Sequence, residues 1–195
     1  MWIKWIAIIG VLIAVSIGIA AIYGSYRWQS ETDRLRAKLT NGQRTIKPQI
    51  YDQKEIEGLP DPVQRFFKTV LKDGQAIVAA VKLAQQGQFN LSETEAKWNP
   101  FTATQLVTTQ RLGFDWDARI QMVPGVNAFV HDTYLLGEGS LHASLLGLFT
   151  VAKMHGSPEN NQGELLRFFA EATWYPTALL PSQGVRWEAK CRVTR

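Results

Sequence analysis

The sequence contains a single cysteine, Cys191, and only three histidines among its 195 residues. One cysteine cannot pair within the chain, so a disulfide-held scaffold is excluded. The histidines, His131, His142 and His155, have no carboxylate or second cysteine at the spacing of a zinc site. We therefore expect no metal and no cofactor.

The usual motifs of enzymes are also missing. Ser144 lacks the glycine two residues earlier that a nucleophile elbow needs for its tight turn. The Gly137–Ser140 stretch has neither the trailing glycine nor the lysine of a phosphate-binding loop. His131 and Asp132 are adjacent, so in a strand they point to opposite faces and do not form an orienting pair. The sequence assigns no catalytic residue.

The positive charge of the chain is concentrated in one short stretch. The formal net charge is +4. Residues 27–50 hold six basic and two acidic residues, whereas residues 51–195 hold 14 basic and 15 acidic residues. The main domain is thus close to neutral and has no basic stripe, which argues against binding to nucleic acid.

The N-terminus carries a long apolar run. From Trp5 to Tyr26 there are 22 consecutive uncharged residues, which as a helix reach about 33 Å and cross the hydrocarbon core of a membrane. The alternative is a signal peptide cut before Ala21, but the run is long for one and aromatic residues follow it directly. We expect residues 1–26 to be an uncleaved single-pass anchor. Gly10, Ala14 and Gly18 form a small-residue stripe on which two such helices can dimerise.

Residues 27–56 are predicted to be a basic juxtamembrane stalk, either a helical continuation of the span or a linker. Leu35 and Leu39 have helical spacing, and Asn41 with Gly42 is a stop signal. The positive-inside rule places this basic flank and the domain after it in the cytoplasm. A signal anchor led by Lys4 predicts the opposite orientation.

The remaining residues, 57–195, are predicted to form an α+β domain. A helix is expected from about residue 62 to 72, where Asp61 can cap, Pro62 opens the helix and apolar residues recur at helical spacing. A second helix is expected between residue 160 and Pro176. Between them the apolar period changes from 3.6 to 2, which is typical of strands.

The strands are expected to form one antiparallel, curved sheet on which the two helices pack. Two stretches, Ala128 to Leu136 and Leu141 to Val151, are apolar on both faces and flank a predicted hairpin turn at residues 137–139. We expect these strands to be central and covered on both sides. Residues 185–193 alternate and predict a last strand.

Asp115, Asp117 and Arg119 alternate with apolar residues along one predicted strand. Such a pattern indicates a strand with one solvated face, on which the carboxylates pair with the arginine. The alternative is a hydrolase-like enzyme that uses these carboxylates, Arg119 or His131 in a cleft as acid and base.

The domain is rich in aromatic residues, and a curved sheet can leave an apolar cavity beneath the second helix. We expect a membrane-anchored domain that binds lipid or another apolar small molecule in this concavity. A third hypothesis is a scaffold that holds partner proteins at the membrane. The candidate pocket residues are Trp98, Phe101, Trp116, Arg119, Asp132 and Trp174.

Several motifs together resemble a bacterial family of uncharacterised, in part membrane-anchored, proteins. They are GLPDPVQRFF at residues 58–67, WNPFTATQ at 98–105, GFDWDARI at 113–120, LLGL at 145–148 and the stretch at 163–188 that contains WYPTALLP. The resemblance implies no catalytic residues. Family members continue with further strand-like sequence, so it also implies that residues 57–195 are a C-terminally truncated domain.

Overall fold

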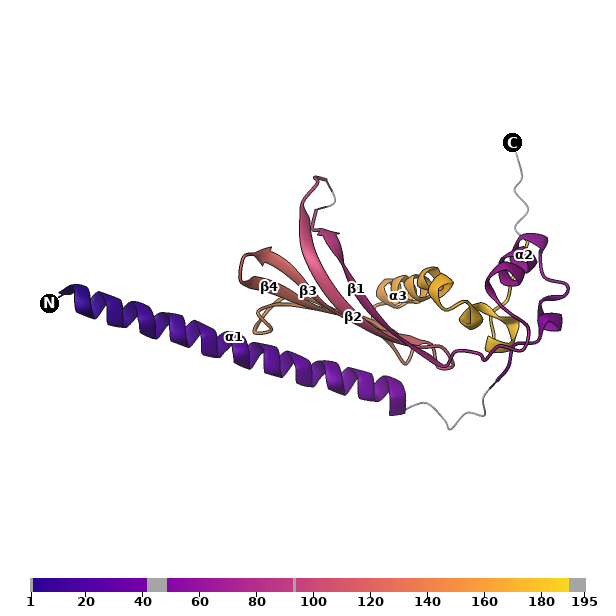
Figure 1. Cartoon of the computed structure of the whole chain (residues 1–195), viewed down its shortest axis with the longest axis horizontal. Coiled ribbons are helices and arrows are strands. Elements are labelled where there is room, and N and C mark those ends of the chain that lie inside the picture. Colours follow the sequence, from indigo (N-terminus) through magenta and orange to yellow (C-terminus); the bar gives the residue numbers. More distant parts are fainter. Residues whose placement is uncertain (1, 42–48, 93, 190–195) are drawn as a thin grey trace.

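The computed structural model describes residues 2–41, 49–92 and 94–189. The chain begins with a long helix, α1 (Trp2–Asn41), and continues through a short 3-10 turn (Gln53–Ile56) to helix α2 (Asp61–Val70). Six strands and helix α3 (Pro158–Glu171) follow, and three 3-10 turns between residues 172 and 183 are the last regular elements of the described part. Figure 1 shows α1 extending far beyond the sheet on its N-terminal side. The predicted α+β class is confirmed.

The six strands form one antiparallel meander in chain order. The strands are β1 (Ala80–Asn90), β2 (Trp98–Thr108), β3 (Gly113–Val123), β4 (Val126–Leu135), β5 (Glu138–Leu145) and β6 (Phe149–His155). The β4–β5 hairpin turns at Leu136 and Gly137, both with positive φ, as a two-residue type I′ turn requires. Because the order is sequential, β1 and β6 are the two edges of the sheet.

The two faces of the sheet are covered by different helices (Figure 1). On one face α3 packs over β4 and β5, above the alternating side chains Phe114, Trp116 and Ala118 of β3. The second half of α1 crosses the opposite face and contacts β2, β3 and β4. The predicted stalk is therefore helical as far as Asn41 and lies on the sheet, while residues 42–48 are outside the described part.

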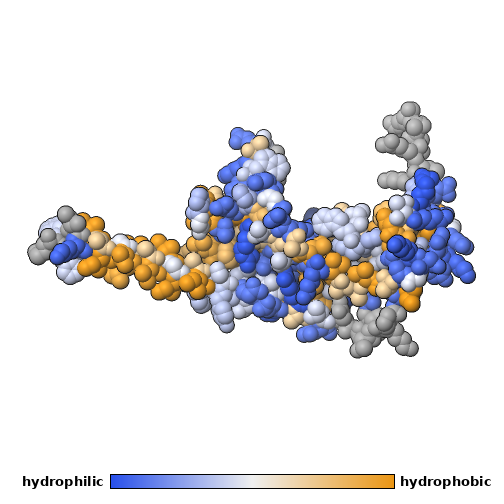
Figure 2. Space-filling view, in the orientation of Figure 1, coloured by the Kyte–Doolittle hydropathy of each residue, from blue (hydrophilic) through white to orange (hydrophobic). Residues whose placement is uncertain are grey.

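The first half of α1 has a different environment from the second. It is the one helix in the described part long and apolar enough to cross a membrane, and its apolar window is fully exposed. Figure 2 shows this apolar surface along the projecting part of the helix. Gly10 and Gly18 have no neighbouring atoms that an added Cβ would meet. Dimerisation through their stripe stays a prediction.

Both predicted domain helices are confirmed, with one difference at a cap. Pro60, not Asp61, is the N-cap residue of α2. Asp61 lies in the first turn, where its negative charge stabilises the helix by interacting with the positive end of the helix dipole. Ser157 caps α3, because its hydroxyl accepts a hydrogen bond from the amide of Asn160.

Two strand predictions are wrong in part. The stretch from Leu141 to Val151 is not one strand, because the chain reverses at Leu146 and Gly147, both with positive φ, and returns as β6. β6 is an exposed edge strand and not a covered central one. Residues 185–189 belong to no helix or strand, and residues 190–193 of the predicted last strand lie outside the described residues.

Candidate functional site

A buried polar cluster joins α1 to the sheet, and Asp117 on β3 is its centre. The side chain of Asp117 accepts hydrogen bonds from Nε1 of Trp28 at 2.9 Å and from the hydroxyl of Thr32 at 3.0 Å. Arg119, two residues along the same strand face, also pairs with it. Asp117 is only 7% exposed, so these three donors replace the water that the carboxylate loses on folding.

The neighbouring carboxylate, Asp115, is held in the same way. Its Oδ2 lies 2.8 Å from Nε of Arg36 on α1, and its Oδ1 lies 2.9 Å from Nδ1 of His131 on β4. Nε2 of His131 in turn lies 3.2 Å from the hydroxyl of Thr32. The cluster is thus one continuous network between α1, β3 and β4.

Aromatic packing reinforces this network. The ring of Trp28 stacks on His131 with a centroid distance of 4.6 Å and meets the edge of Phe129 at 5.7 Å. The guanidinium of Arg119 lies 4.1 Å from the centroid of Phe129. Burial raises the pKa of Asp117, but Arg119, His131 and the Trp28 hydrogen bond outweigh it and hold the pKa below its usual value.

The prediction that Asp115 and Asp117 form a solvated strand face is wrong. Both are buried, because the second half of α1 covers that face. The clue was present in α1, where Gly24, Trp28, Thr32 and Leu39 recur on one side of the helix. The charged residues between them gave the segment the composition of a solvated stalk.

The geometry also bears on the hydrolase hypothesis. Asp115, Asp117, Arg119 and His131 converge, and Asp115, His131 and Thr32 form a chain of acid, imidazole and hydroxyl. However, the exposed fractions of Thr32 and His131 are 1% and 2%. A substrate reaches the hydroxyl of Thr32 only if α1 leaves the sheet. In this arrangement the buried polar cluster holds α1 on the sheet.

A close backbone contact locates α1 against the end of the sheet. A Cβ added at Gly24 would lie 2.1 Å from the carbonyl oxygen of Leu146 and 2.8 Å from Cγ of Leu148. A Cβ added at Gly147 would lie 2.5 Å from the carbonyl oxygen of Gly24. The β5–β6 turn therefore packs directly on the α1 backbone, just where the uncharged run of residues 5–26 ends.

A second polar cluster lies on the other face of the sheet, under α3. Arg167 of α3 pairs with Asp132 on β4 and, at 2.9 Å, with Glu171. Its guanidinium also lies 5.2 Å from the centroid of Trp116. Glu164, one turn before Arg167, brings a third carboxylate to this site, and Oδ1 of Asp132 has no hydrogen-bond partner in the described part.

Crowding of these carboxylates affects their protonation. Burial, and then the charge of Asp132, raise the pKa of Glu164 to about 7, and burial raises the pKa of Asp132 as well. Between about pH 4.5 and 7 the folded protein therefore holds a proton on Glu164 that the unfolded chain releases. Stability must fall as the pH rises through this window, because the folded state binds more protons.

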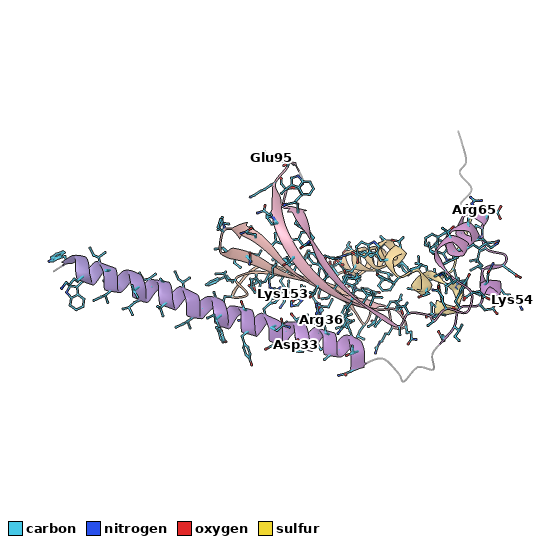
Figure 3. All side chains as sticks on the ribbon, in the orientation of Figure 1. Asp33, Arg36, Lys54, Arg65, Glu95 and Lys153 are labelled. Atoms are coloured by element: carbon cyan, nitrogen blue, oxygen red, sulfur yellow. The ribbon has the colours of Figure 1, made fainter. Side chains whose placement is uncertain are left out.

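We predict that Glu164→Gln removes this loss. The variant should be more stable than the native chain at pH 8 by about 1–2 kcal/mol, after allowance for screening by solvent, and its stability should vary less between pH 5 and 7. Thermal unfolding of the full chain in detergent across this range measures the effect. Glu95→Gln, at the exposed tip of the β1–β2 hairpin (Figure 3), is the control and should keep the native pH profile. A Glu164→Gln profile parallel to the native one would contradict the prediction.

The structure brings together only part of the predicted pocket. Phe101, Trp116 and Asp132 lie on the α3 face, where Phe101 and Trp116 have ring centroids 6.1 Å apart. Arg119 lies on the opposite face, in the α1 cluster. The other two residues, Trp98 and Trp174, are 60% and 58% exposed.

Hydrogen bonds engage the polar groups around Trp116 beneath α3. Trp116 donates from Nε1 to Gln85 at 2.7 Å, and Gln105 donates to Glu171 at 2.7 Å. Trp116 is thus a packing and hydrogen-bonding group of the core, and a ligand site in the sheet concavity stays a prediction.

An apolar groove of about 850 Å³ lies beside α3. Pro62, Val63 and Phe66 of α2 form one wall, Phe169 and Ala170 of α3 the second, and the segment with Leu179, Val185 and Trp187 the third. Arg186 is the one charged residue in its lining. Sequence reasoning missed this groove because its walls come from three segments that are far apart in the chain.

A second groove, of about 690 Å³, runs along α1 from Glu31 to Asn41. Its other wall is formed by the ends of β4, β5 and β6. In Figure 3, Lys153 of this wall lies next to α1. This groove opens beside the buried polar cluster, because His131 belongs to both.

Comparison with known proteins gives a family but no function. No curated protein and no solved structure matches the chain. Residues 57–191, which include α2, the whole sheet and α3, match the model of a family of unknown function, DUF6920. The chain belongs to the DUF6920 family.

Proposed function

We propose that this protein is a membrane-anchored domain that binds the acyl chain of a lipid in the apolar groove between α2, α3 and residues 179–187. The observation that carries the proposal is the size and lining of this groove. Its volume of about 850 Å³ is in the range of small-molecule sites, which are mostly apolar with few polar groups. The site differs from the predicted one, since it lies beside α3 and not in the sheet concavity.

The chemistry of the lining favours an acyl chain with an acidic head group. Apolar side chains from α2, α3 and the segment after it face the groove, and burying apolar surface against them gives about 25 cal/mol per Å². Arg186 is exposed at the groove and has no ion pair in the described part of the chain. A carboxylate or phosphate at the end of the bound chain would give this arginine a partner.

The first half of α1 supports a lipid as the ligand. Its exposed apolar length matches a membrane span, so the domain is held where lipids are abundant. We place the domain on the cytoplasmic side, because six basic residues lie between residues 27 and 50. We do not propose a hydrolase, because the Thr32 hydroxyl and the His131 imidazole, which such an enzyme would use, are buried between α1 and the sheet.

Filling the groove should abolish lipid binding. Ala170 is an exposed α3 residue in the groove lining, and Ala170→Trp places a large ring there. Native mass spectrometry of the full chain, extracted from membranes, should show bound lipid that falls at least fivefold in Ala170→Trp. Gln162→Trp, on the same helix but outside the groove, should retain the native amount. A native protein without lipid, or equal retention by both variants, would refute the proposal.

A further inference from the structure

The groove along α1 has a chemical character that the apolar groove lacks. Its lining combines apolar residues with seven basic or imidazole side chains and two acidic ones, Glu31 and Glu138. The apolar residues are Leu35, Leu135, Leu136, Leu141 and Met154. The basic or imidazole residues are Arg34, Lys38, Arg111, Lys153, His131, His142 and His155.

The two acidic residues are already engaged by neighbours. Glu31 pairs with Arg34, and Glu138 lies 3.5 Å from Nε2 of His155. The side chains of Lys38, Arg111 and Lys153 have no ion pair or hydrogen bond with any residue that the structure describes. The groove therefore keeps an excess of positive charge that nothing in the described chain neutralises.

The positive charge of the groove also affects the pKa of His142. Burial and then the positive charge of Lys153 lower the pKa of His142, and His131 adds to this. His142 also lies beside the buried polar cluster, since its ring centroid is 5.0 Å from that of Trp28. A negative charge in the groove would thus meet several cationic groups and an imidazole at once.

We propose that this groove binds a small amphiphilic anion, with a phosphate or carboxylate head against Lys38, Arg111 and Lys153 and an apolar part against the leucines. Clusters of basic residues attract such heads, and the apolar lining gains from burial. The chain segment that follows α1 in the sequence is a poor occupant, because residues 42–51 include Arg44 and Lys47 and no acidic residue. The site is separate from the apolar groove of the proposed function and does not depend on it.

The volume of the groove limits the ligand to a small molecule. At about 690 Å³ the groove is in the range of small-molecule sites. It begins at Glu31, five residues and thus about 7.5 Å along the helix from Tyr26, where the uncharged run ends. The proposed occupant is therefore a small anion with a short apolar part.

Calorimetric titration of the full chain in zwitterionic nanodiscs tests the proposal. Hexyl phosphate should bind at least tenfold more tightly than inorganic phosphate, because only the former has an apolar part. The charge-reversal pair Lys38→Glu with Lys153→Glu should weaken hexyl phosphate binding at least tenfold, and Lys82→Glu on β1 should not. Ala170→Trp should leave this affinity unchanged, which separates the two grooves.

Two results would overturn the proposal. One is equal binding of hexyl phosphate and inorganic phosphate, or no binding of either. The other is an affinity that Lys38→Glu with Lys153→Glu reduces no more than Lys82→Glu does. All of these lysines are exposed, so folding should persist, and the milder Lys153→Gln should give a smaller loss in the same direction.

Discussion

Replacing Asp117 with alanine is expected to reduce the free energy of unfolding by about 3–5 kcal/mol and to release the second half of α1 from the sheet. The change removes the one acceptor shared by Trp28, Thr32 and Arg119. It leaves the Arg119 charge without its partner and Nε1 of Trp28 buried without an acceptor among the described residues, whereas the Thr32 hydroxyl keeps the carbonyl of Trp28 at 3.2 Å. Losing a partner inside a buried ion pair is among the most destabilising single changes.

Two measurements on the full chain in detergent check this expectation. Urea unfolding followed by tryptophan fluorescence gives the loss of stability. Hydrogen exchange should show the amides of residues 28–39 exchanging much faster, with a smaller effect on β1 at the far edge of the sheet. The exchange measurement distinguishes release of the helix from general unfolding.

The matched control for this change is Asp33→Ala. Asp33 is an exposed aspartate on α1 whose side chain accepts from Gln29 at 3.0 Å (Figure 3). Its removal should cost less than about 0.5 kcal/mol. If Asp117→Ala were as stable as Asp33→Ala, the buried cluster would not be what holds α1 on the sheet.

The second large effect is expected at Gly24. Gly24→Leu keeps the apolar run and favours the helix, since leucine has a much higher helix propensity than glycine. The docked structure has no room for the side chain, because the first added carbon would already lie 2.1 Å from a backbone oxygen. The β5–β6 turn must therefore move away from α1, at a cost of at least about 1–3 kcal/mol.

Gly18→Leu is the control for the same substitution on the same helix. Gly18 has no atoms near the position of an added Cβ, so its replacement should leave the docking intact. Thermal unfolding and hydrogen exchange at residues 145–149 compare the two variants. Equal stability of Gly24→Leu and Gly18→Leu would show that the glycine contact does not position the sheet.

The elements that follow local rules were predictable from the sequence. The apolar run, the helix after Pro62 and the alternation of β3 each depend on residues within one segment. The turn at Leu146 and Gly147 was not, because LLGL is apolar and lacks the polar turn residues that mark such reversals.

The candidate sites were harder to predict, because each depends on which segments meet. The alternation within β3 predicts that Asp115 and Asp117 are solvated, and they are buried because α1 packs on that face. Trp116 and Asp132 do meet, since they pair in the β3–β4 register, and their polar groups bind Gln85 and Arg167. Neither groove is marked by a motif, since both are assembled from distant segments.

The packing of α1 on the sheet also affects the position of the proposed lipid site relative to the membrane. If the second half of α1 were a free linker, the domain would sample many orientations at the membrane. The cluster around Asp117 and the contact at Gly24 instead fix the sheet to the helix that would span the membrane. In a membrane-anchored protein the apolar groove, at the end of the domain beyond α3 (Figure 1), would then lie at a set distance from the bilayer.

Site-specific photo-crosslinking tests the lipid proposal most directly. Benzoylphenylalanine replaces Phe169, which lines the apolar groove, or Leu166, an exposed α3 residue outside it, in the full chain in living cells. After irradiation, mass spectrometry of the purified protein identifies what is attached. We predict a lipid adduct at position 169 and none at position 166. A peptide adduct at position 169, from this chain or another protein, or no adduct at all, would contradict the proposed function.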